Sequence, residues 1–438
     1  MNYQKYLGLL KEAVAYKSIS TDAVYQPEVE KMVSFLENLY KTHGFTVTVA
    51  RGYDNPIIIA SYVVSPEAKT VLIYGHYDIQ PADISDGWET DPYGLTEKEG
   101  RIYGRGAVDN KGQFMIHTAT VFDLIEAGKL KYNVKFMIEG NEETGSPHIT
   151  QFMHDYAETL KSDFALISDG EITAGIPTLE TGFRGGFNST TTVVTSTTDL
   201  HSGLFGGAVP MASLVLSEML GKLFVNGKVT IPGFYDDVLE IAPEDIENNR
   251  RIPFTLEEYK NLSGAKELTS LDGYDFYTQV GLRPAVVITG MQSGYVGEGY
   301  RNSVPSKAVA KINFRLVKNQ NPEELAKKFA EYMKQLAPSY ADVTVEYSDP
   351  YDGIKLNTNN EYVEKARGIL AEVYGTEPIF KYCGGGLPIV TLIDDIFKIP
   401  QVLLPLANED CRMHAVGENY RVDLIEKGLR FSEAFLGE

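Results

Sequence analysis

The stretch that decides the fold is residues 71–112, VLIYGHYDIQPADISDGWETDPYGLTEKEGRIYGRGAVDNKG. It begins with the apolar run VLIY (71–74), which is typical of a buried strand ended by a glycine. His76 and Asp78 follow two residues apart, so along an extended chain their side chains point to the same side. Asp109 lies further on, in a glycine-flanked loop ahead of an apolar segment. Taken alone, the stretch also fits an ordinary strand end followed by turn residues.

Similar residues stand at later strand ends and in one loop near the end of the chain. Glu142 and Glu143 follow the apolar run VKFMIEG, Asp169 ends the run FALISDG, and His414 lies in the loop CRMHAVG. In open α/β sheets ligands bind at the carboxyl ends of strands. Imidazole and carboxylate donors without thiolates suit zinc, manganese or cobalt and argue against a purely structural zinc knot. Each acid alone also resembles a solvated cap, but together they predict a metal site.

The glutamate pair indicates what this metal site does. Adjacent residues on an extended chain point to opposite sides, so one glutamate can bind a metal while its neighbour faces a water. A free carboxylate beside a metal site is what a hydrolase needs to take a proton from the attacking water. The alternative is a metal-binding or scaffold protein on an inactive enzyme fold. Because the chain keeps a spare glutamate beside the ligands, the pattern favours the enzyme.

Strand and helix patterns alternate up to about residue 170, which predicts a largely parallel sheet covered by helices on both faces. The helical segments are expected at 3–16, 27–43, 113–127, 147–160, 210–223 and 322–336. After Thr181 the texture changes to β-branched and hydroxyl residues, as in FNSTTTVVTST (187–197), which suits a half-exposed strand. We therefore predict an α/β main domain formed by 1–183 and 354–438, interrupted by a smaller α+β domain at 184–353. Residues 230–275 are polar and proline-broken and are predicted to form an insertion.

Composition excludes several kinds of partner. The 438 residues carry a formal net charge of -20, which argues against a nucleic-acid or anionic-membrane surface. No apolar stretch approaches the length of a membrane span, and the first twenty residues lack the apolar core of a signal peptide. The two cysteines, Cys383 and Cys411, make no spacing motif and suggest no disulfide framework. These features predict a cytoplasmic protein.

The motifs HYDIQP, GRGAVDNKG, EGNEETGS, ISDG and DLHSG occur in this order along the chain. Together they resemble the M20 metallopeptidases, and most closely the carnosinase and cytosolic nonspecific dipeptidase branch. The resemblance implies a di-metal catalytic domain interrupted by a lid domain that forms a homodimer. It also implies hydrolysis of the peptide bond in dipeptides or short peptides. Deacylation of N-acyl amino acids is the alternative, because the same metal site serves it equally well.

The resemblance assigns the metal ligands residue by residue. It implies two divalent ions, zinc first with manganese or cobalt as alternatives, about 3.5–4 Å apart. The ligands would be His76 and Asp169 for one ion, Glu143 and His414 for the other, and Asp109 for both.

The resemblance also assigns roles beside the metal. Asp78 would orient His76, because a metal-binding imidazole needs its second nitrogen held. Glu142 would be the general base. A cis peptide bond between Asp109 and Asn110 is implied as well.

The smaller domain carries three further matches. The resemblance implies that His201, in the motif DLHSG, reaches into the partner subunit's site and polarises the scissile carbonyl. Without the resemblance, His201 would instead be taken for a capping residue in a glycine turn. Asn302 and Arg315 resemble substrate-contacting positions, and an arginine fork suits a peptide carboxylate. Arg315 equally fits a strand-face arginine paired to an acid of the same domain.

One loop departs from the family pattern. Where the family commonly has Arg-Glu-Gly-Gly-Ser-Ile-Pro, this chain has YCGGGLP (382–388). The resemblance implies that the serine position contacts the substrate carboxylate, and here only the backbone N–H of Gly386 is available. Cys383 is either a contact or reactive thiol or a buried inert one. Four histidines match no motif and are predicted to be helix-surface or capping residues; these are His43, His117, His148 and His154.

Overall fold

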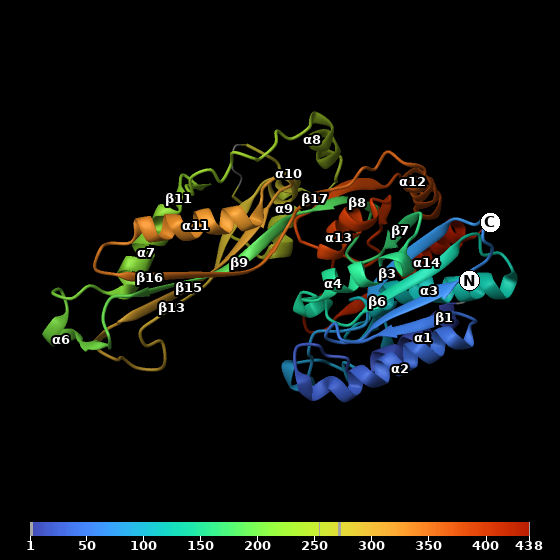
Figure 1. The fold of residues 1–438 in the computed structure, drawn as a ribbon, viewed down its shortest axis with the longest axis horizontal. Helices are drawn as coiled ribbons and strands as arrows, with labels where there is room; N and C mark the ends of the chain where they lie inside the picture. Colours follow the sequence, from blue (N-terminus) through green and yellow to red (C-terminus); the bar gives the residue numbers. More distant parts are fainter. Residues whose placement is uncertain (1–2, 254, 270–272, 438) are drawn as a thin grey trace.

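The computed structural model describes residues 3–253, 255–269 and 273–437. Figure 1 shows an elongated molecule with a main part, which holds both ends of the chain, and a narrower part that we call the lid. The main part is built on a nine-stranded sheet and the lid on a four-stranded sheet. Within the described residues no helix is both long and apolar enough to cross a membrane.

The sheet of the main part has the strand order β1-β2-β6-β3-β7-β19-β8-β17, with β18 paired to β8. Its strands are β1 (Thr46–Ala50), β2 (Ile57–Tyr62), β3 (Thr70–His76), β6 (Asn133–Glu139), β7 (Phe164–Ile167), β8 (Thr178–Phe183), β17 (Ile354–Lys355), β18 (Ile379–Cys383) and β19 (Gln401–Leu403). The central strands β6, β3, β7 and β19 are parallel, whereas β1, β2 and β17 pair antiparallel. The predicted α/β fold class is therefore confirmed, with antiparallel strands added at both edges.

Helices cover both faces of this sheet because successive residues of a buried strand point to opposite sides. On β3, Val71 and Ile73 belong to one apolar cluster while Leu72 and Tyr74 belong to the other. The first cluster includes helices α1 (Tyr3–Ala15), α2 (Gln26–Thr42), α3 (Lys111–Ala127), α12 (Glu361–Tyr374) and α14 (Val422–Leu436). The second includes α4 (Ile149–Asp155) and α13 (Pro388–Phe397), and the helix expected at 147–160 is divided into α4 and α5 (Ala157–Leu160).

Helix α3 shows where one prediction is wrong. His117 was expected at a helix surface or cap, but it is fully buried in the middle of α3. Its ring nitrogens lie 3.0 Å from the Ser432 hydroxyl and 2.9 Å from the Ser168 hydroxyl. The helix is packed on all sides, so a polar residue in it must find buried partners. His148 and His43 do cap helices, and His154 is exposed on α4.

The lid is a four-stranded antiparallel sheet with helices on one face (Figure 1). Its strands, in sheet order, are β13 (Ala285–Ser293), β15 (Lys307–Leu316), β9 (Gly185–Val194) and β16 (Asp342–Tyr351). Alternate residues of β9 and β15 are buried under α7 (Ala212–Lys222) and α11 (Pro322–Leu336). Strands β10 (Leu200–His201) and β14 (Ser303–Val304) pair beside α6 (Ser202–Phe205), at the end of the lid far from the main part.

The chain crosses between the two parts twice, through neighbouring segments. Strand β8 ends at Phe183 and β9 begins at Gly185, while β16 ends at Tyr351 and β17 begins at Ile354. A Cβ atom on Gly185 would lie 2.4 Å from the backbone nitrogen of Gly353, so only glycine fits this close approach.

The predicted insertion contains two helices, α8 (Pro243–Arg250) and α9 (Leu256–Ser263), and α10 (Phe276–Leu282) follows directly after it. This region packs against the main part. Ile252 and Tyr277 from this region pack against Ile379 of β18. The remaining short elements are β4 (Thr96–Lys98), β5 (Arg101–Tyr103), β20 (Asn419–Arg421), β11 (Phe224–Val225), β12 (Lys228–Val229), η1 (Ala23–Tyr25), η2 (Ile84–Asp86) and η3 (Glu142–Thr144).

Candidate metal centre

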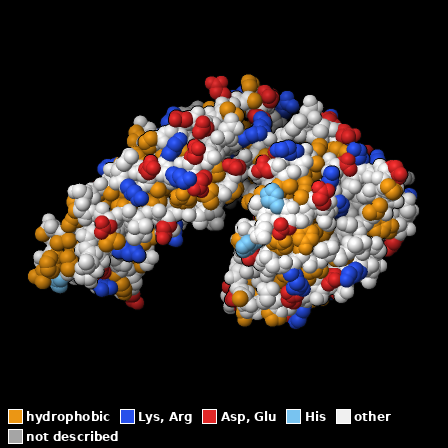
Figure 2. All heavy atoms as spheres, viewed as in Figure 1, with side chains coloured by type: hydrophobic (Ala, Val, Ile, Leu, Met, Phe, Trp, Pro, Cys, Tyr) orange, Lys and Arg blue, Asp and Glu red, His pale blue; other side chains and the backbone are white. Residues whose placement is uncertain are grey.

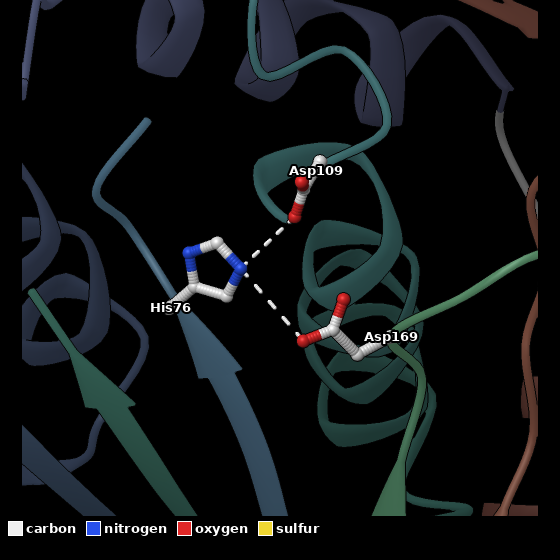
Figure 3. Close-up of side chains that lie close together, drawn as sticks. All are labelled: His76, Asp109 and Asp169. Atoms are coloured by element: carbon white, nitrogen blue, oxygen red, sulfur yellow. Dashed lines mark hydrogen bonds and ion pairs between the residues drawn. The ribbon is translucent and has the colours of Figure 1, made fainter. Parts of the chain in front are cut away.

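Three predicted ligands meet at the carboxyl edge of the central parallel strands. His76 ends β3, Asp169 follows β7, and Asp109 lies in the loop before α3 (Figure 3). His76 Nε2 is 3.0 Å from Asp109 Oδ1 and 3.7 Å from Asp169 Oδ2. Parallel strands bring these residues together because their carboxyl ends share one edge of the sheet.

A second group shares Asp109 with the first. His414 Nε2 lies 2.7 Å from Asp109 Oδ2 and 3.1 Å from Glu143 Oε2. In each group the three candidate ligand atoms lie within 4.8 Å of one another. The structure therefore gathers all five residues that the sequence proposed as ligands, with one carboxylate common to both groups.

The electrostatics of these groups fit divalent cations. The ion pairs that the structure describes for Asp109, Glu143 and Asp169 are all with histidines. Hydrogen bonds to Asp109 and Glu143 raise the pKa of His414 to about 10, and burial raises the pKa of Asp169 to about 7. The His414 shift reflects the two acids beside its ring, which favour a positive charge at this place. Nitrogen and oxygen donors without thiolates suit zinc, manganese or cobalt.

Asp78 is fully buried and binds several groups at once. Its Oδ1 lies 3.3 Å from Nδ1 of His76, and it accepts the backbone N–H groups of Glu142 (3.2 Å) and Glu143 (3.1 Å). The Ser20 hydroxyl donates to Oδ2 at 2.7 Å. The backbone carbonyl of Asp78 lies closer still to Nδ1 of His76, at 3.1 Å, so the carbonyl and the carboxylate of one residue together orient this imidazole. Ser20 was missed because no motif links it to a residue 58 positions later.

The glutamates do not lie on an extended chain, and this part of the prediction is wrong. Glu142 and Glu143 occupy the 3₁₀ turn η3, and Asp78 binds both of their N–H groups. Glu143 nevertheless reaches the second ligand group, and Gln80 donates a hydrogen bond to its Oε2 at 2.7 Å. Glu142 belongs to neither ligand group. Burial, with Asp169 and Asp109 nearby, raises the pKa of Glu142 well above its usual value.

Asn110 connects the ends of two strands beside the centre. Its Nδ2 donates to the Ser168 carbonyl at 2.8 Å, and its Oδ1 accepts the His76 N–H at 3.4 Å. The Asp109–Asn110 peptide bond is cis, as the resemblance implies. Asn110 therefore helps to fix the spacing of the strand ends that carry His76 and Asp169.

Two predicted site residues lie elsewhere. His201 and Asn302 belong to the far end of the lid, where the Ser202 N–H donates to the Asn302 carbonyl at 3.1 Å. His201 is exposed and its Nδ1 accepts the Gly203 N–H at 3.0 Å, so within one chain it caps α6. The structure of one chain does not bring either residue to the metal groups.

Arg315 and Gly386 come together at the opposite end of the lid. Arg315 Nη1 donates to the Tyr351 hydroxyl at 3.1 Å. A Cβ atom on Gly386 would lie 2.6 Å from the ring of Tyr351, so this ring covers the glycine. In the described part of the chain, Arg315 forms no ion pair with a lid acid, contrary to one of the two alternatives. Tyr351 was missed because it belongs to no motif.

Both cysteines lie where burial disfavours the thiolate. Burial raises the pKa of Cys383 to about 12, which argues against a reactive nucleophile in the glycine loop. Cys411 is buried and donates to Glu171 Oε1 at 3.0 Å.

An α/β sheet with two ligand groups joined by one aspartate, and a smaller inserted domain, defines a metal-dependent hydrolase. The chain belongs to peptidase family M20/M25/M40, whose model matches residues 72–438. It is 30% identical to the Beta-Ala-His dipeptidase of Homo sapiens, over 100% of this chain and 90% of that protein. It is 29% identical to the Cys-Gly metallodipeptidase dug1 of Schizosaccharomyces pombe, over 99% of this chain and 95% of that protein. The M20 family metallo-carboxypeptidase Sso-CP2 from Sulfolobus solfataricus has a TM-score of 0.90 at 28% identity, over 100% and 99% of the two chains.

Proposed function

We propose that this protein is a metal-dependent dipeptidase that hydrolyses the peptide bond of dipeptides or short peptides. The observation that carries the proposal is the pair of ligand groups sharing Asp109, with Glu142 beside them and outside both. The names of the relatives, a Beta-Ala-His dipeptidase and a Cys-Gly metallodipeptidase, support dipeptides as the substrate class.

The ligand groups would hold two divalent ions, with zinc as the first choice and manganese or cobalt as alternatives. His76, Asp109 and Asp169 would hold one ion, and Asp109, Glu143 and His414 the other. When bound, such ions acidify a water molecule and polarise a carbonyl group.

Two residues beside the ions would have separate roles: Glu142 would transfer the proton and Asp78 would hold the groups around it. Glu142 takes the proton of the attacking water and returns it to the amine that leaves. Its raised pKa suits this role, because an acceptor must also release the proton within the same cycle. Asp78 keeps His76 in position through Nδ1 and holds the turn that carries Glu142.

We further propose the division into 1–183, 184–353 and 354–438, and a homodimer formed through the lid. His201 and Asn302 lie beside exposed apolar side chains, including Leu204 (76% exposed), Val296 (84%) and Tyr300 (97%). Figure 2 shows hydrophobic side chains gathered at this end, and a broad hollow between the lid and the main part. A lid contributed by a second copy would bring its histidine towards that hollow. The partner subunit's His201 would donate to the developing oxyanion.

A substrate panel tests the proposal. The metal-free protein would be reloaded with Zn²⁺, Mn²⁺ or Co²⁺ and assayed on dipeptides and on N-acyl amino acids. We expect cleavage of dipeptides, which depends on the added ion and disappears with a chelator. Turnover of N-acyl amino acids alone would support the deacylase alternative, which uses the same site and which the relatives' names do not favour.

A further inference from the structure

Glu418 is a buried acid that the proposed reaction does not use. It precedes β20 and is fully buried, and no motif marks it. Its Oε1 accepts the backbone N–H groups of Val108 at 2.9 Å and Asp109 at 3.1 Å. Its Oε2 accepts the Gly106 N–H at 3.0 Å and Nη1 of Arg105 at 2.7 Å. One carboxylate thus holds the whole loop that presents Asp109.

The same contacts connect this loop to the loop that carries His414. Glu418 lies four residues after His414, so its carboxylate joins the two segments directly. Arg105 completes the connection, because its Nη2 donates to the carbonyl of Ala415 at 3.2 Å. Strands β5 and β20 pair just outside these loops and give them a common base. The 2.7 Å approach of His414 Nε2 to Asp109 Oδ2 therefore depends on a clasp formed by Arg105 and Glu418.

The ligands of the two groups differ in how they are supported. His76 and Asp169 stand at the ends of β3 and β7, which are hydrogen-bonded neighbours in the sheet. His414 lies in a loop, is 52% exposed at its side chain, and has a left-handed backbone (φ 61) that is rare for a residue other than glycine. A loop ligand of this kind needs an additional support, and the clasp provides it.

We propose that Glu418 is a positioning residue that sets the spacing between Asp109 and His414. It therefore acts more strongly on the Asp109–Glu143–His414 group than on the His76–Asp109–Asp169 group, in which two of the three ligands stand at the ends of paired strands. The proposal rests on the two-ion centre of the proposed function. A glutamine at position 418 keeps the shape but has only one acceptor oxygen. Its NH₂ group is a donor and would face other donors. These would be the N–H groups of Val108 and Asp109 in one orientation, or the Gly106 N–H and the Arg105 guanidinium in the other. The loop would then lose its fixed spacing from His414.

Metal titration of Glu418→Gln tests the assignment. Metal-free wild type and variant would be titrated with Mn²⁺ alone by calorimetry, and electron paramagnetic resonance would report the magnetic coupling of a bound pair. We expect wild type to bind two coupled ions. In Glu418→Gln the second ion should bind about 10- to 100-fold more weakly, the usual cost of losing a residue that supports a metal ligand. The first ion should be weakened much less, because two of its three ligands do not depend on Glu418. The coupled signal should require correspondingly more Mn²⁺.

Asp410→Asn is the matched control. Asp410 pairs with Arg101 at 2.7 and 3.0 Å and so joins the same two segments. It is exposed, and these contacts involve neither Asp109 nor His414. We expect it to bind both ions as wild type does. Melting curves of the metal-free proteins separate positioning from stability, since a purely structural role would lower the melting temperature and leave both affinities unchanged.

Each failure has its own meaning. Two ions bound with wild-type affinity by folded Glu418→Gln, or both ions weakened equally, would overturn the assignment and leave the proposed function intact. A wild type that binds a single ion would overturn the two-ion centre and the assignment together. If Glu418→Gln does not fold, Arg105→Lys replaces it, because lysine keeps the charge but cannot also reach the Ala415 carbonyl. The proposal then expects weaker binding chiefly of the second ion, and unchanged binding refutes it.

Discussion

The metal centre and the far end of the lid position their functional residues in opposite ways. At the centre, His76 and Asp78 are fully buried and bound by neighbours from several strands and loops. At the lid end, the His201 side chain is exposed among apolar side chains, and the hydrogen bond that the structure describes for its ring is to its own turn. A buried network fixes side chains by itself, whereas an exposed histidine is fixed only when another surface covers it. The comparison fits the proposal that one site is completed within the chain and the other between two copies of it.

The largest effect is expected from Glu142→Ala. The water would lose its proton acceptor, so kcat should fall about 10²- to 10⁴-fold. Because Glu142 belongs to neither ligand group, both ions should remain. Steady-state kinetics beside elemental analysis of the same preparation measures both quantities. A variant that loses an ion would mean that Glu142 is a ligand.

Glu143→Ala should fail for a different reason. Glu143 lies 3.1 Å from His414 Nε2 and shares the second ligand group with Asp109. Its loss should reduce the metal content from two ions to one, and activity should fall with occupancy. Excess metal should restore part of the rate, which it cannot do for Glu142→Ala. The reverse pattern in the two variants would show that their roles have been exchanged.

The sequence predicted that His76 and Asp169 lie together because both follow strand ends. Parallel strands bring such positions to one edge, so His76 and Asp169 could be placed without coordinates. Supporting residues escaped prediction, since Glu418 reaches Asp109 across 309 positions and no local pattern records the contact. His117 escaped because a helix buried on all sides has no polar face to locate it. The turn at Glu142 replaced an expected extended segment because Asp78 binds its N–H groups.

His201→Ala tests whether the lid end acts across the dimer. Removing one donor to the oxyanion costs about 2.7–4 kcal/mol, or about 10²- to 10³-fold in kcat. Mixed with Glu142→Ala, it should regain activity after subunit exchange. One of the two sites in the mixed dimer would carry both defects and the other neither. Activity that does not return, despite exchange shown by mass spectrometry, would place His201 outside the partner's site.

Of these substitutions, Arg315→Ala is expected to reduce activity the least. It tests whether the two ends of the lid serve different sites. Arg315 lies at the end of the lid next to the segments that cross to the main part, where it pairs with Gly186 across the sheet. It donates to the Tyr351 hydroxyl, and the ring of Tyr351 covers Gly386. These contacts belong to its own chain, so it should serve its own chain's site although it lies on the lid. Arg315→Ala should lose a hydrogen bond to a charged substrate group, about 1.5–3 kcal/mol, seen chiefly as a raised KM.

The subunit that supplies Arg315 follows from a second mixing experiment. In a dimer of Arg315→Ala with Glu142→Ala, one site lacks the base and the other lacks the arginine, so neither is intact. Activity should therefore stay at the level of the unmixed variants, whereas the His201→Ala mixture recovers. Asn302→Ala, from the same end as His201, should behave like His201→Ala. Recovery with Arg315→Ala would mean that the whole lid serves the partner, and the division of the lid into two ends would be wrong.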